Sequence, residues 1–323
     1  MARLLFISDP LDGFKIHKDS TFAMMQAAQH RGHSVWWATA QALSCAWRGG
    51  VARPSVAAQS IRLLGQGHHQ GQTSPWWSVV EAAALAPTDI DVILMRKDPP
   101  FDVTYLVATQ MLELFERLGV HVINRPQALR DHGEKLSALE FTRWAPPGLV
   151  SASISELRAF AAEHPRVVYK PLDAMGGSGV FVTQADDPNL PVILETLTDM
   201  GSRAIMAQQH LSAIVDGDKR ILLINGQPIA QVLARIPPKG ASRGNLAAGG
   251  RGEARPLTAR DLEIAQDLGP ILASRGLFLV GLDVIGEHLT EINVTSPTGF
   301  QEITQQTGFD VADHFMAALE GLL

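Results

Sequence analysis

The sequence predicts an α/β protein, with an open parallel sheet in its N-terminal part and an α+β arrangement in its C-terminal part. Near the N-terminus an apolar run, 3–8, is followed by a helical segment, 20–32, and a second apolar run, 33–38. Strand, helix and strand in this order indicate a parallel α/β unit. Near the C-terminus, residues 281–299 alternate apolar and polar side chains on both sides of a short turn, a pattern typical of a β-hairpin.

Composition limits the classes of protein to consider. The chain has 323 residues, 46% of them hydrophobic and 19% charged, so we expect two or three packed units. A net charge of −6 gives no reason to expect a nucleic-acid or membrane partner. The single cysteine, Cys45, excludes an internal disulfide framework and fits a reducing compartment. The first apolar run is too short for a signal peptide, so we expect a cytoplasmic protein.

The first unit continues the strand and helix alternation. Ser20 is a candidate helix cap, and Gly32 stands where that helix would end. The stretch 43–77 is rich in Gly, Gln, Ala and Ser, and we expect short strands and exposed loops there. The remaining predicted elements of this unit are a strand at 91–94, a helix at 104–118 and a strand at 120–123. The charged segment 95–101 follows a strand end, which is where open α/β sheets bind ligands.

The rest of the chain alternates helices and strands less regularly. Asn225-Gly226 between two apolar runs is a strong hairpin signal. The predicted helices are 130–144, 155–163, 258–274 and 311–322. The predicted strands are 166–170, 180–183, 204–208, 219–224 and 227–234, followed by a long irregular segment and the C-terminal hairpin.

The C-terminal hairpin is a candidate metal site. Strand period two puts Glu291 and Asn293 on one face, and a three-residue turn at 286–288 would place Asp283 directly across from Glu291. Two carboxylates facing each other in an apolar setting repel, and a cation would relieve that repulsion. Three hard oxygen ligands suit Mg²⁺. A solvated hairpin face is the alternative that these three residues alone leave open.

Two lysines and a glycine-rich loop are candidate phosphate ligands. Lys170 ends an apolar run and precedes the loop 173–179, in which backbone N–H groups can point at phosphate oxygens. Lys135 is the second candidate. The spacing matches neither a Walker-type loop nor the dinucleotide fingerprint, so an ordinary turn beside a snorkelling lysine remains the alternative.

The long segment 235–255 concentrates positive charge. It contains five arginine or lysine residues and one acid, Glu253, in an otherwise glycine-rich stretch. Arginine forks bind carboxylate and phosphate oxygens bidentately, so we expect a mobile lid over an anionic substrate rather than a solvated linker. In the nearby run 216–220, Asp218 and Arg220 share one strand face. Arg220 would then lie beside the hairpin carboxylates, unless the two form only an exposed ion pair.

Taken together, the chain resembles the ATP-grasp superfamily, and most closely its bacterial-type glutathione synthetases. The likeness covers nearly the whole chain in the family's order. The blocks that carry it are K-D-S-T-F-A-M (18–24), D-V-I-L-M-R-K-D-P-P-F-D (91–102), L-R-D-H-G-E-K (129–135), K-P-L-D-A-M-G-G-S-G (170–179), D-G-D-K-R (216–220), A-R-I-P (234–237), R-G-N-L-A-A-G-G-R-G (243–252) and G-L-D-V-I-G with L-T-E-I-N-V-T-S-P-T (281–298).

The resemblance implies a role for each candidate group. Lys135 and Lys170 would bind ATP phosphates, and Gly176, Gly177 and Gly179 would cover them. The adenine hinge would be Gln208, Gln209, His210 and Leu211, although His210 stands where the family pattern suggests an aromatic residue. Asp283, Glu291 and Asn293 would bind Mg²⁺, with Mn²⁺ as an alternative. Arg220, Arg235 and Arg243 would contact substrate carboxylates and the transferred phosphoryl group.

The resemblance also implies a domain plan and a reaction. A substrate-binding unit at 1–124 would precede a two-part ATP-grasp fold, with a central subdomain at 125–205 and a C-terminal subdomain at 206–323 that includes the lid 235–255. The implied reaction joins γ-glutamylcysteine to glycine through an acyl phosphate, in a homo-oligomer by family analogy. Another ATP-grasp carboxylate–amine ligase, such as a dipeptide or amino-acid ligase, is one alternative. A nucleotide-binding protein without turnover is the other.

Overall fold

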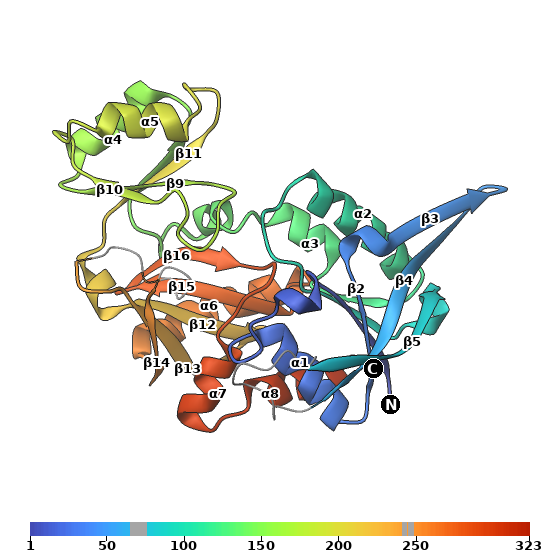
Figure 1. Cartoon of the computed structure of the whole chain (residues 1–323). Coiled ribbons are helices and arrows are strands. Elements are labelled where there is room, and N and C mark those ends of the chain that lie inside the picture. Colours follow the sequence, from blue (N-terminus) through green and yellow to red (C-terminus); the bar gives the residue numbers. More distant parts are fainter. Residues whose placement is uncertain (65–75, 241–243, 245–248) are drawn as a thin grey trace.

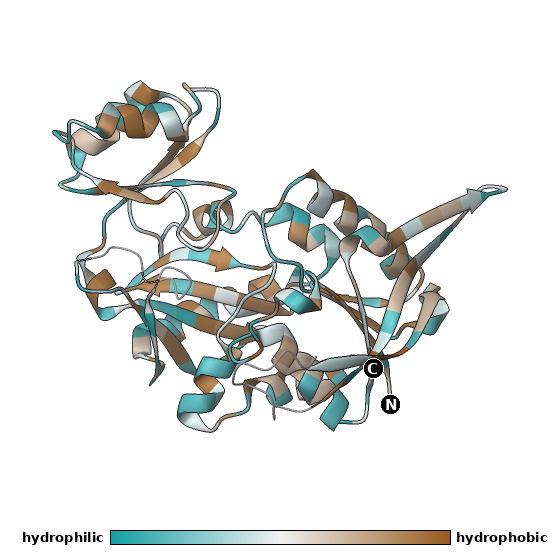
Figure 2. Ribbon diagram, in the orientation of Figure 1, coloured by the Kyte–Doolittle hydropathy of each residue, from teal (hydrophilic) through white to brown (hydrophobic). Residues whose placement is uncertain are grey.

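The computed structural model describes residues 1–64, 76–240, 244 and 249–323, and its strands form three sheets in this part of the chain (Figure 1). Much of the apolar colour in Figure 2 follows the sheet strands and the helices packed on them. No helix among these residues is long and apolar enough to cross a membrane.

The N-terminal sheet is parallel at its centre, as predicted. Strand β1 (Arg3–Ile7) pairs in parallel with β2 (Ser34–Ala38) and with β6 (Val92–Met95), and β6 pairs in parallel with β7 (His121–Ile123). Helices α1 (Ser20–His30) and α2 (Val103–Arg117) belong to this unit. The cap of α1 is Asp19 rather than Ser20, because the Asp19 carboxylate accepts a hydrogen bond from Phe22 N at 2.8 Å.

The expectation of short strands and exposed loops at 43–77 is wrong for β4 (Val51–Leu63), which has 13 residues. The other strands here are the six-residue β3 (Leu43–Arg48) and β5 (Trp77–Leu85), which begins at the last residue of the segment, and both pair antiparallel with β4. Gly49 and Gly50 take φ of +59° and +78°, which allows the tight turn between β3 and β4. Figure 1 shows this hairpin projecting from the body of the molecule. Residues 65–75 lie outside the described part.

The middle lobe is a small sheet with its own core. Its strands run in the order β10 (Phe181–Thr183), β9 (Val167–Pro171), β11 (Ile205–Gln209) and β8 (Gly148–Ser151). Helices α4 (Ile154–Glu163) and α5 (Leu190–Leu197) lie over it (Figure 1). The core of the lobe contains residues from these elements alone. The lobe therefore packs separately from the rest of the chain.

The C-terminal sheet is antiparallel, in the order β14-β13-β12-β15-β16. Its strands are β12 (Asp218–Ile224), β13 (Gln227–Ile236), β14 (Arg251–Pro256), β15 (Leu279–Ile285) and β16 (His288–Asn293). Its helices are α6 (Ala259–Ser274), α7 (Phe300–Thr307) and α8 (Val311–Glu320). One hydrophobic core joins this sheet to the N-terminal unit, so the first and last parts form a common base under the middle lobe.

The predicted helix at 130–144 is wrong. The chain forms a short α3 (Pro126–Asp131) and a 3₁₀ helix, Leu136–Phe141, separated by an irregular turn. In that turn the Glu134 carbonyl accepts a hydrogen bond from Ile292 N at 2.9 Å. Pairing with a distant strand thus replaces the local helical hydrogen bonds that the sequence pattern favours.

The hairpin prediction is correct in register but not in its turn. Asp283 pairs with Glu291, as expected. The turn has two residues, because Ile285 already pairs with His288, and a bulge between Asp283 and Val284 restores the register.

The proposed lid is shorter than 235–255. Arg235 lies inside β13 and is only 6% exposed, and the far end of the segment forms β14, where Arg251 pairs with Ile236. A glycine-rich, positively charged composition therefore does not tell us whether a residue of this segment lies in a loop or in a strand. A Cβ on Gly244 would lie 2.2 Å from the Arg235 carbonyl oxygen, so only glycine fits this close approach. We propose three domains that follow the three sheets, with the second boundary after Gln209 rather than at 205.

Candidate active site

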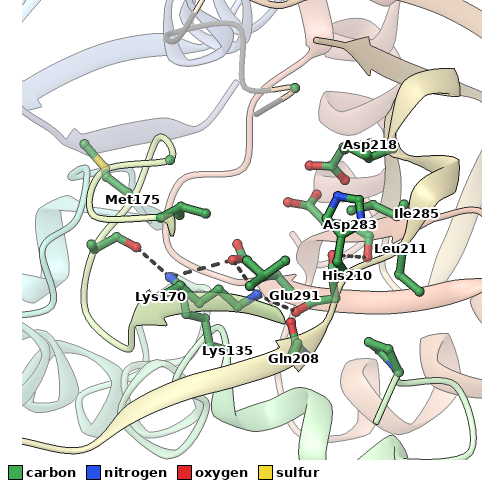
Figure 3. Close-up of a pocket in the computed structure, with 18 of the residues that line it drawn as sticks. Lys135, Lys170, Met175, Gln208, His210, Leu211, Asp218, Asp283, Ile285 and Glu291 are labelled. Atoms are coloured by element: carbon green, nitrogen blue, oxygen red, sulfur yellow. Dashed lines mark hydrogen bonds and ion pairs between the residues drawn. The ribbon is translucent and has the colours of Figure 1, made fainter. Parts of the chain in front are cut away.

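The largest group of predicted site residues meets in one pocket between the middle lobe and the C-terminal sheet (Figure 3). The pocket encloses about 860 Å³ of space, including open solvent at its mouth. The predicted residues that line it are Lys135, Lys170, Gly176, Gly177, Gln208, Gln209, His210, Leu211, Asp283 and Glu291. Gly179 is not among the lining residues. Residues far apart in the sequence therefore share one cavity.

Glu291 lies between the two lysines. Lys170 Nζ is 3.3 Å from Glu291 Oε1, and Lys135 Nζ is 3.7 Å from the same oxygen. Both lysines are buried. Burial alone would raise the pKa of Glu291, but Lys170 and then Lys135 outweigh it, so the net pKa is lowered. Glu291 is therefore an anion that faces two cations across the pocket.

The glycine loop folds over the same cavity. Gly176, Gly177 and Gly179 take φ of +64°, +80° and +67°, a region that other residues rarely adopt. The Lys135 ammonium donates a hydrogen bond to the Ala174 carbonyl at 2.5 Å. The loop is thus connected to Lys135.

The end of β11 forms another wall. His210 N donates to the Arg166 carbonyl at 3.0 Å, and Gln209 N donates to the Pro147 carbonyl at 2.9 Å. These bonds fix the backbone of the predicted hinge beside Val168, Pro146 and Ile214, which supply apolar lining. Burial lowers the pKa of His210, favouring the neutral imidazole.

Asp283 is paired with two arginines. Arg220 Nε lies 2.6 Å from Asp283 Oδ1, and Arg235 Nη2 lies 2.8 Å from Asp283 Oδ2. The sheet explains this arrangement, because β12 lies between β13 and β15 and places Arg220 directly across from Asp283. Burial acts to raise the pKa of Asp283, but the two guanidinium groups outweigh it and lower the pKa well below its usual range.

Asp218 extends this cluster. Arg235 Nη2 also lies 2.6 Å from Asp218 Oδ2, so one guanidinium bridges two carboxylates. Burial raises the pKa of Asp218 to about 6, although Arg235 acts in the opposite direction. The other Asp218 oxygen is buried, and no hydrogen-bond partner is found for it among the described residues. Asp218 lines the first pocket.

The predicted metal ligands fit a hard divalent cation. Asp283 and Glu291 both have lowered pKa values, so both carboxylates are available as anions. Asn293 donates through Nδ2 to the Gly281 carbonyl at 3.2 Å, which leaves its amide oxygen for a ligand. Among the described residues, no group of three or more acidic, histidine or cysteine side chains is arranged to hold a metal ion by itself. Two carboxylates and one amide oxygen are nevertheless a set that suits Mg²⁺.

A second pocket adjoins the first. Both are lined by Asp283 and Glu291 together with the loop residues 174–176. The second pocket is also lined by Arg220, Arg235 and Asn293, and by residues of two further segments, Asp98 and Pro99, and 295–298. Arg243 lies outside the described residues, so its predicted place here stays a prediction. The carboxylates thus stand at the junction of a lysine-lined and an arginine-lined cavity.

The sequence reasoning missed Glu134, which lines the second pocket. Its Oε1 accepts hydrogen bonds from Val294 N at 3.0 Å and from Thr295 N and Oγ1 at 3.2 and 2.8 Å. Burial raises the pKa of Glu134 despite these bonds. Its position next to Lys135 in the sequence was the available signal. Glu134 attaches the segment carrying Lys135 to the strand carrying Glu291 and Asn293.

Two solved structures have folds similar to that of this chain. The chain resembles the D-cycloserine synthetase DcsG with a TM-score of 0.67 at 14% identity, over 99% of this chain and all of that one. It also resembles the ATP-grasp ligase PsnB, solved with a minimal precursor, Mg and ADP, with a TM-score of 0.62 at 15% identity, over 99% and 97% of the two chains. The chain therefore has the fold of the ATP-grasp ligase PsnB.

Sequence comparison identifies the family. The model of the prokaryotic glutathione synthetase N-terminal domain matches residues 2–130, and that of the ATP-grasp domain matches residues 134–308. A glutathione synthetase of Ralstonia nicotianae is 52% identical over 318 residues, which cover 98% of this chain and 95% of the relative. One of Pseudomonas aeruginosa is 49% identical over 323 residues, covering 100% and 98%. The chain belongs to the prokaryotic glutathione synthetase family.

Proposed function

We propose that this chain joins the cysteinyl carboxylate of γ-glutamylcysteine to the amine of glycine, with cleavage of ATP to ADP and phosphate. The observation that carries the proposal is the junction of the two pockets at Asp283 and Glu291. A nucleotide in the first pocket would direct its terminal phosphate toward this junction. A substrate carboxylate in the second pocket would approach it from the arginine side.

The first pocket binds ATP. Lys135 and Lys170 neutralise its phosphates, and the N–H groups of the loop at Gly176 and Gly177 approach the phosphate oxygens. Gly179 supports the loop conformation through its positive φ. The segment from Gln208 to Leu211 contacts the adenine edge at the end of β11. ATP binding therefore engages the middle lobe, which packs separately from the base.

A divalent metal, which we assign as Mg²⁺ with Mn²⁺ as an alternative, would be bound by Asp283, Glu291 and Asn293. When bound, it neutralises charge on the terminal phosphates. In the structure Glu291 is paired with lysines and Asp283 with arginines. With ATP and metal bound, Lys135 and Lys170 would contact phosphate oxygens, and Asp283 and Glu291 would hold the metal.

The reaction has two steps. A carboxylate oxygen of γ-glutamylcysteine attacks the γ-phosphorus, and the bond to the β-phosphate oxygen breaks to release ADP. The glycine amine then attacks the acyl carbon of the acyl phosphate, inorganic phosphate leaves, and one amine proton passes to solvent. Arg220 and Arg235 stabilise the negative charge that passes through the junction. Arg243 is proposed to act with them from the lid, which excludes water from the acyl phosphate.

The experiment that tests this proposal measures ADP release with each substrate omitted in turn. We expect release to require both γ-glutamylcysteine and glycine. A panel of amines distinguishes another ATP-grasp ligase, in which glycine would rank poorly. Tight ATP binding with no ADP formed under any substrate would instead show a nucleotide-binding protein without turnover.

We also propose a cellular compartment and a class of partners for this enzyme. The single cysteine, Cys45, supports a reducing, cytoplasmic compartment. The substrates are small molecules, so neither a nucleic acid nor a membrane is required. We also infer a homo-oligomer.

A further inference from the structure

The chain that leads into Lys135 is not held by regular secondary structure. Helix α3 ends at Asp131, the 3₁₀ helix begins at Leu136, and residues 132–135 form the irregular turn between them. On its inner side the turn is attached to the C-terminal sheet and the residues after it, through the backbone and side chain of Glu134. Contacts on its outer side therefore also affect where the Lys135 ammonium lies.

His132 attaches the outer side of the turn, and it is only 6% exposed. Its ring Nδ1 lies 2.8 Å from the Ala128 carbonyl oxygen, and its ring Nε2 lies 2.9 Å from Arg275 Nη1. A carbonyl only accepts hydrogen bonds, and a guanidinium only donates them. Nδ1 therefore carries the ring proton, and Nε2 accepts from Arg275. Both ring nitrogens of His132 hold the turn in place.

Arg275 contacts the chain both before and after Lys135. It directly follows the last residue of α6, and its side chain is 35% exposed. While Nη1 donates to His132, Nη2 donates to Glu140 Oε2 at 2.8 Å. His132 stands three positions before Lys135, and Glu140 stands five positions after it. One guanidinium thus attaches both ends of the segment 132–140 to α6.

The middle of this segment reaches the first pocket, where Lys135 Nζ lies 3.7 Å from Glu291 Oε1. The planar guanidinium has donors in fixed directions, so its two contacts restrict each other. His132, Glu140 and Arg275 line a separate pocket and neither of the two ligand pockets. Their effect on a ligand therefore passes through the chain that carries Lys135.

We propose that Arg275 is a positioning residue, which acts through His132 and Glu140 to hold the Lys135 ammonium where it meets the phosphates of ATP. The inference rests on the phosphate role given to Lys135 in the proposed function. Without the guanidinium fork, the segment 132–140 keeps its inner attachment through Glu134 but loses its outer one. The affinity for ATP phosphates then falls, while contacts to adenine, which come from the end of β11, are unchanged.

Arg275→Lys tests this role, because lysine keeps the positive charge but lacks the fork that reaches two acceptors. We expect ATP affinity, measured by titration calorimetry, to fall by about fivefold, as for residues that act on a site without touching the ligand. The affinity for adenosine, which has no phosphate, should be unchanged in a competition assay. Arg260→Lys is the matched control, since Arg260 lies on α6, has a side chain 36% exposed and pairs with Glu263 at 3.1 Å. Unchanged ATP affinity in Arg275→Lys, or an equal loss for adenosine, would overturn the proposal.

A double-mutant cycle with Lys135→Ala tests whether the loss passes through Lys135. Lys135→Ala alone should weaken ATP binding by about tenfold or more, and adding Arg275→Lys should weaken it no further. An additive loss in the double variant would overturn the positioning role alone and leave the proposed function standing. Unchanged ATP affinity in Lys135→Ala would refute the phosphate role of Lys135, and the positioning role with it.

His132→Gln and His132→Leu test the contact before Lys135. Glutamine places an amide oxygen near the position of Nε2, where it can accept from Arg275, whereas leucine has no acceptor. We expect ATP affinity to fall less in His132→Gln than in His132→Leu. Urea unfolding checks that each variant is folded, and Arg275→Lys decides the proposal if His132→Leu does not fold. Similar losses in two folded variants would contradict a role for the bond to Arg275.

Discussion

Lys170 Nζ lies 3.3 Å from Glu291 Oε1, and Lys135 shares the same oxygen at 3.7 Å. A carboxylate assigned to a metal is thus neutralised by the two lysines assigned to phosphates. On the assignments proposed above, entry of ATP together with metal would release each partner. We therefore propose that Glu291 couples nucleotide binding to metal binding.

Glu291→Gln tests this coupling. The variant frees both lysines but removes a metal ligand, so ATP should bind without metal at least as tightly as in the wild type. Turnover should fall by about 100-fold or more. Titration calorimetry with and without Mg²⁺, together with ADP release, measures the two effects. Glu287→Gln in the exposed hairpin turn is the control, and unchanged activity in Glu291→Gln would refute the metal assignment.

We expect Glu134 to stabilise the structure through the hydrogen bonds that it accepts rather than through a negative charge. Glu134→Ala leaves the donors of Val294 and Thr295 unpaired, which costs about 1–3 kcal/mol for a buried group. Because these residues follow Asn293, the variant should also need a higher metal concentration for half-maximal activity. Glu134→Gln keeps an oxygen in place and should remain close to the wild type. Urea unfolding and metal titration of both variants check this, and equal loss in the two would contradict it.

Arg235 bridges two buried carboxylates, and its loss should be costly. Arg235→Met leaves Asp218 and Asp283 without this partner, and we expect a loss of about 3–5 kcal/mol in the free energy of unfolding. Arg251→Met removes an arginine of the neighbouring strand whose side chain is 73% exposed, so its loss should be within about 1 kcal/mol. Urea unfolding compares the two. Similar losses would show that Arg235 is not part of a buried network.

Asp218 should make stability depend on pH. Burial raises its pKa to about 6, against about 3.9 in an unfolded chain. The stability gained from the retained proton is fully present below about pH 4 and is lost as the pH rises through 6. Asp218→Asn mimics the neutral form, so the wild type should lose stability relative to the variant between pH 4 and 7. Unfolding free energies across this range measure the difference, and a constant difference would contradict the shifted pKa.

Local patterns were sufficient for part of the site. The alternation around Asp283 and Glu291 predicted that both face each other, and the structure confirms this although the turn differs. Of the two alternatives for Arg220, the structure confirms the position beside the hairpin acids rather than an exposed ion pair with Asp218. Strand periodicity determines the facing side chains, and a bulge can correct the register without changing them.

Other parts depend on contacts that no local pattern records. Glu134 takes its place through hydrogen bonds to residues about 160 positions away. Arg235 belongs to a glycine-rich, positively charged stretch that was expected to be a lid, yet it lies in a strand. Two carboxylates from other strands neutralise its charge there. Short strands and exposed loops were expected at 43–77 from its content of Gly, Gln, Ala and Ser, but such small residues also fit the two-stranded ribbon of β3 and β4. In each case, contacts with residues distant in the sequence determine the local structure.

In the proposed reaction, phosphate passes from ATP to the cysteinyl carboxylate before the peptide bond forms. The most direct measurement uses γ-glutamylcysteine labelled with ¹⁸O in that carboxylate, with ATP, Mg²⁺ and glycine, and mass analysis of the phosphate released. We expect one ¹⁸O atom in each phosphate, formed in equal amount with ADP and the amide product. Phosphate without the label would contradict it.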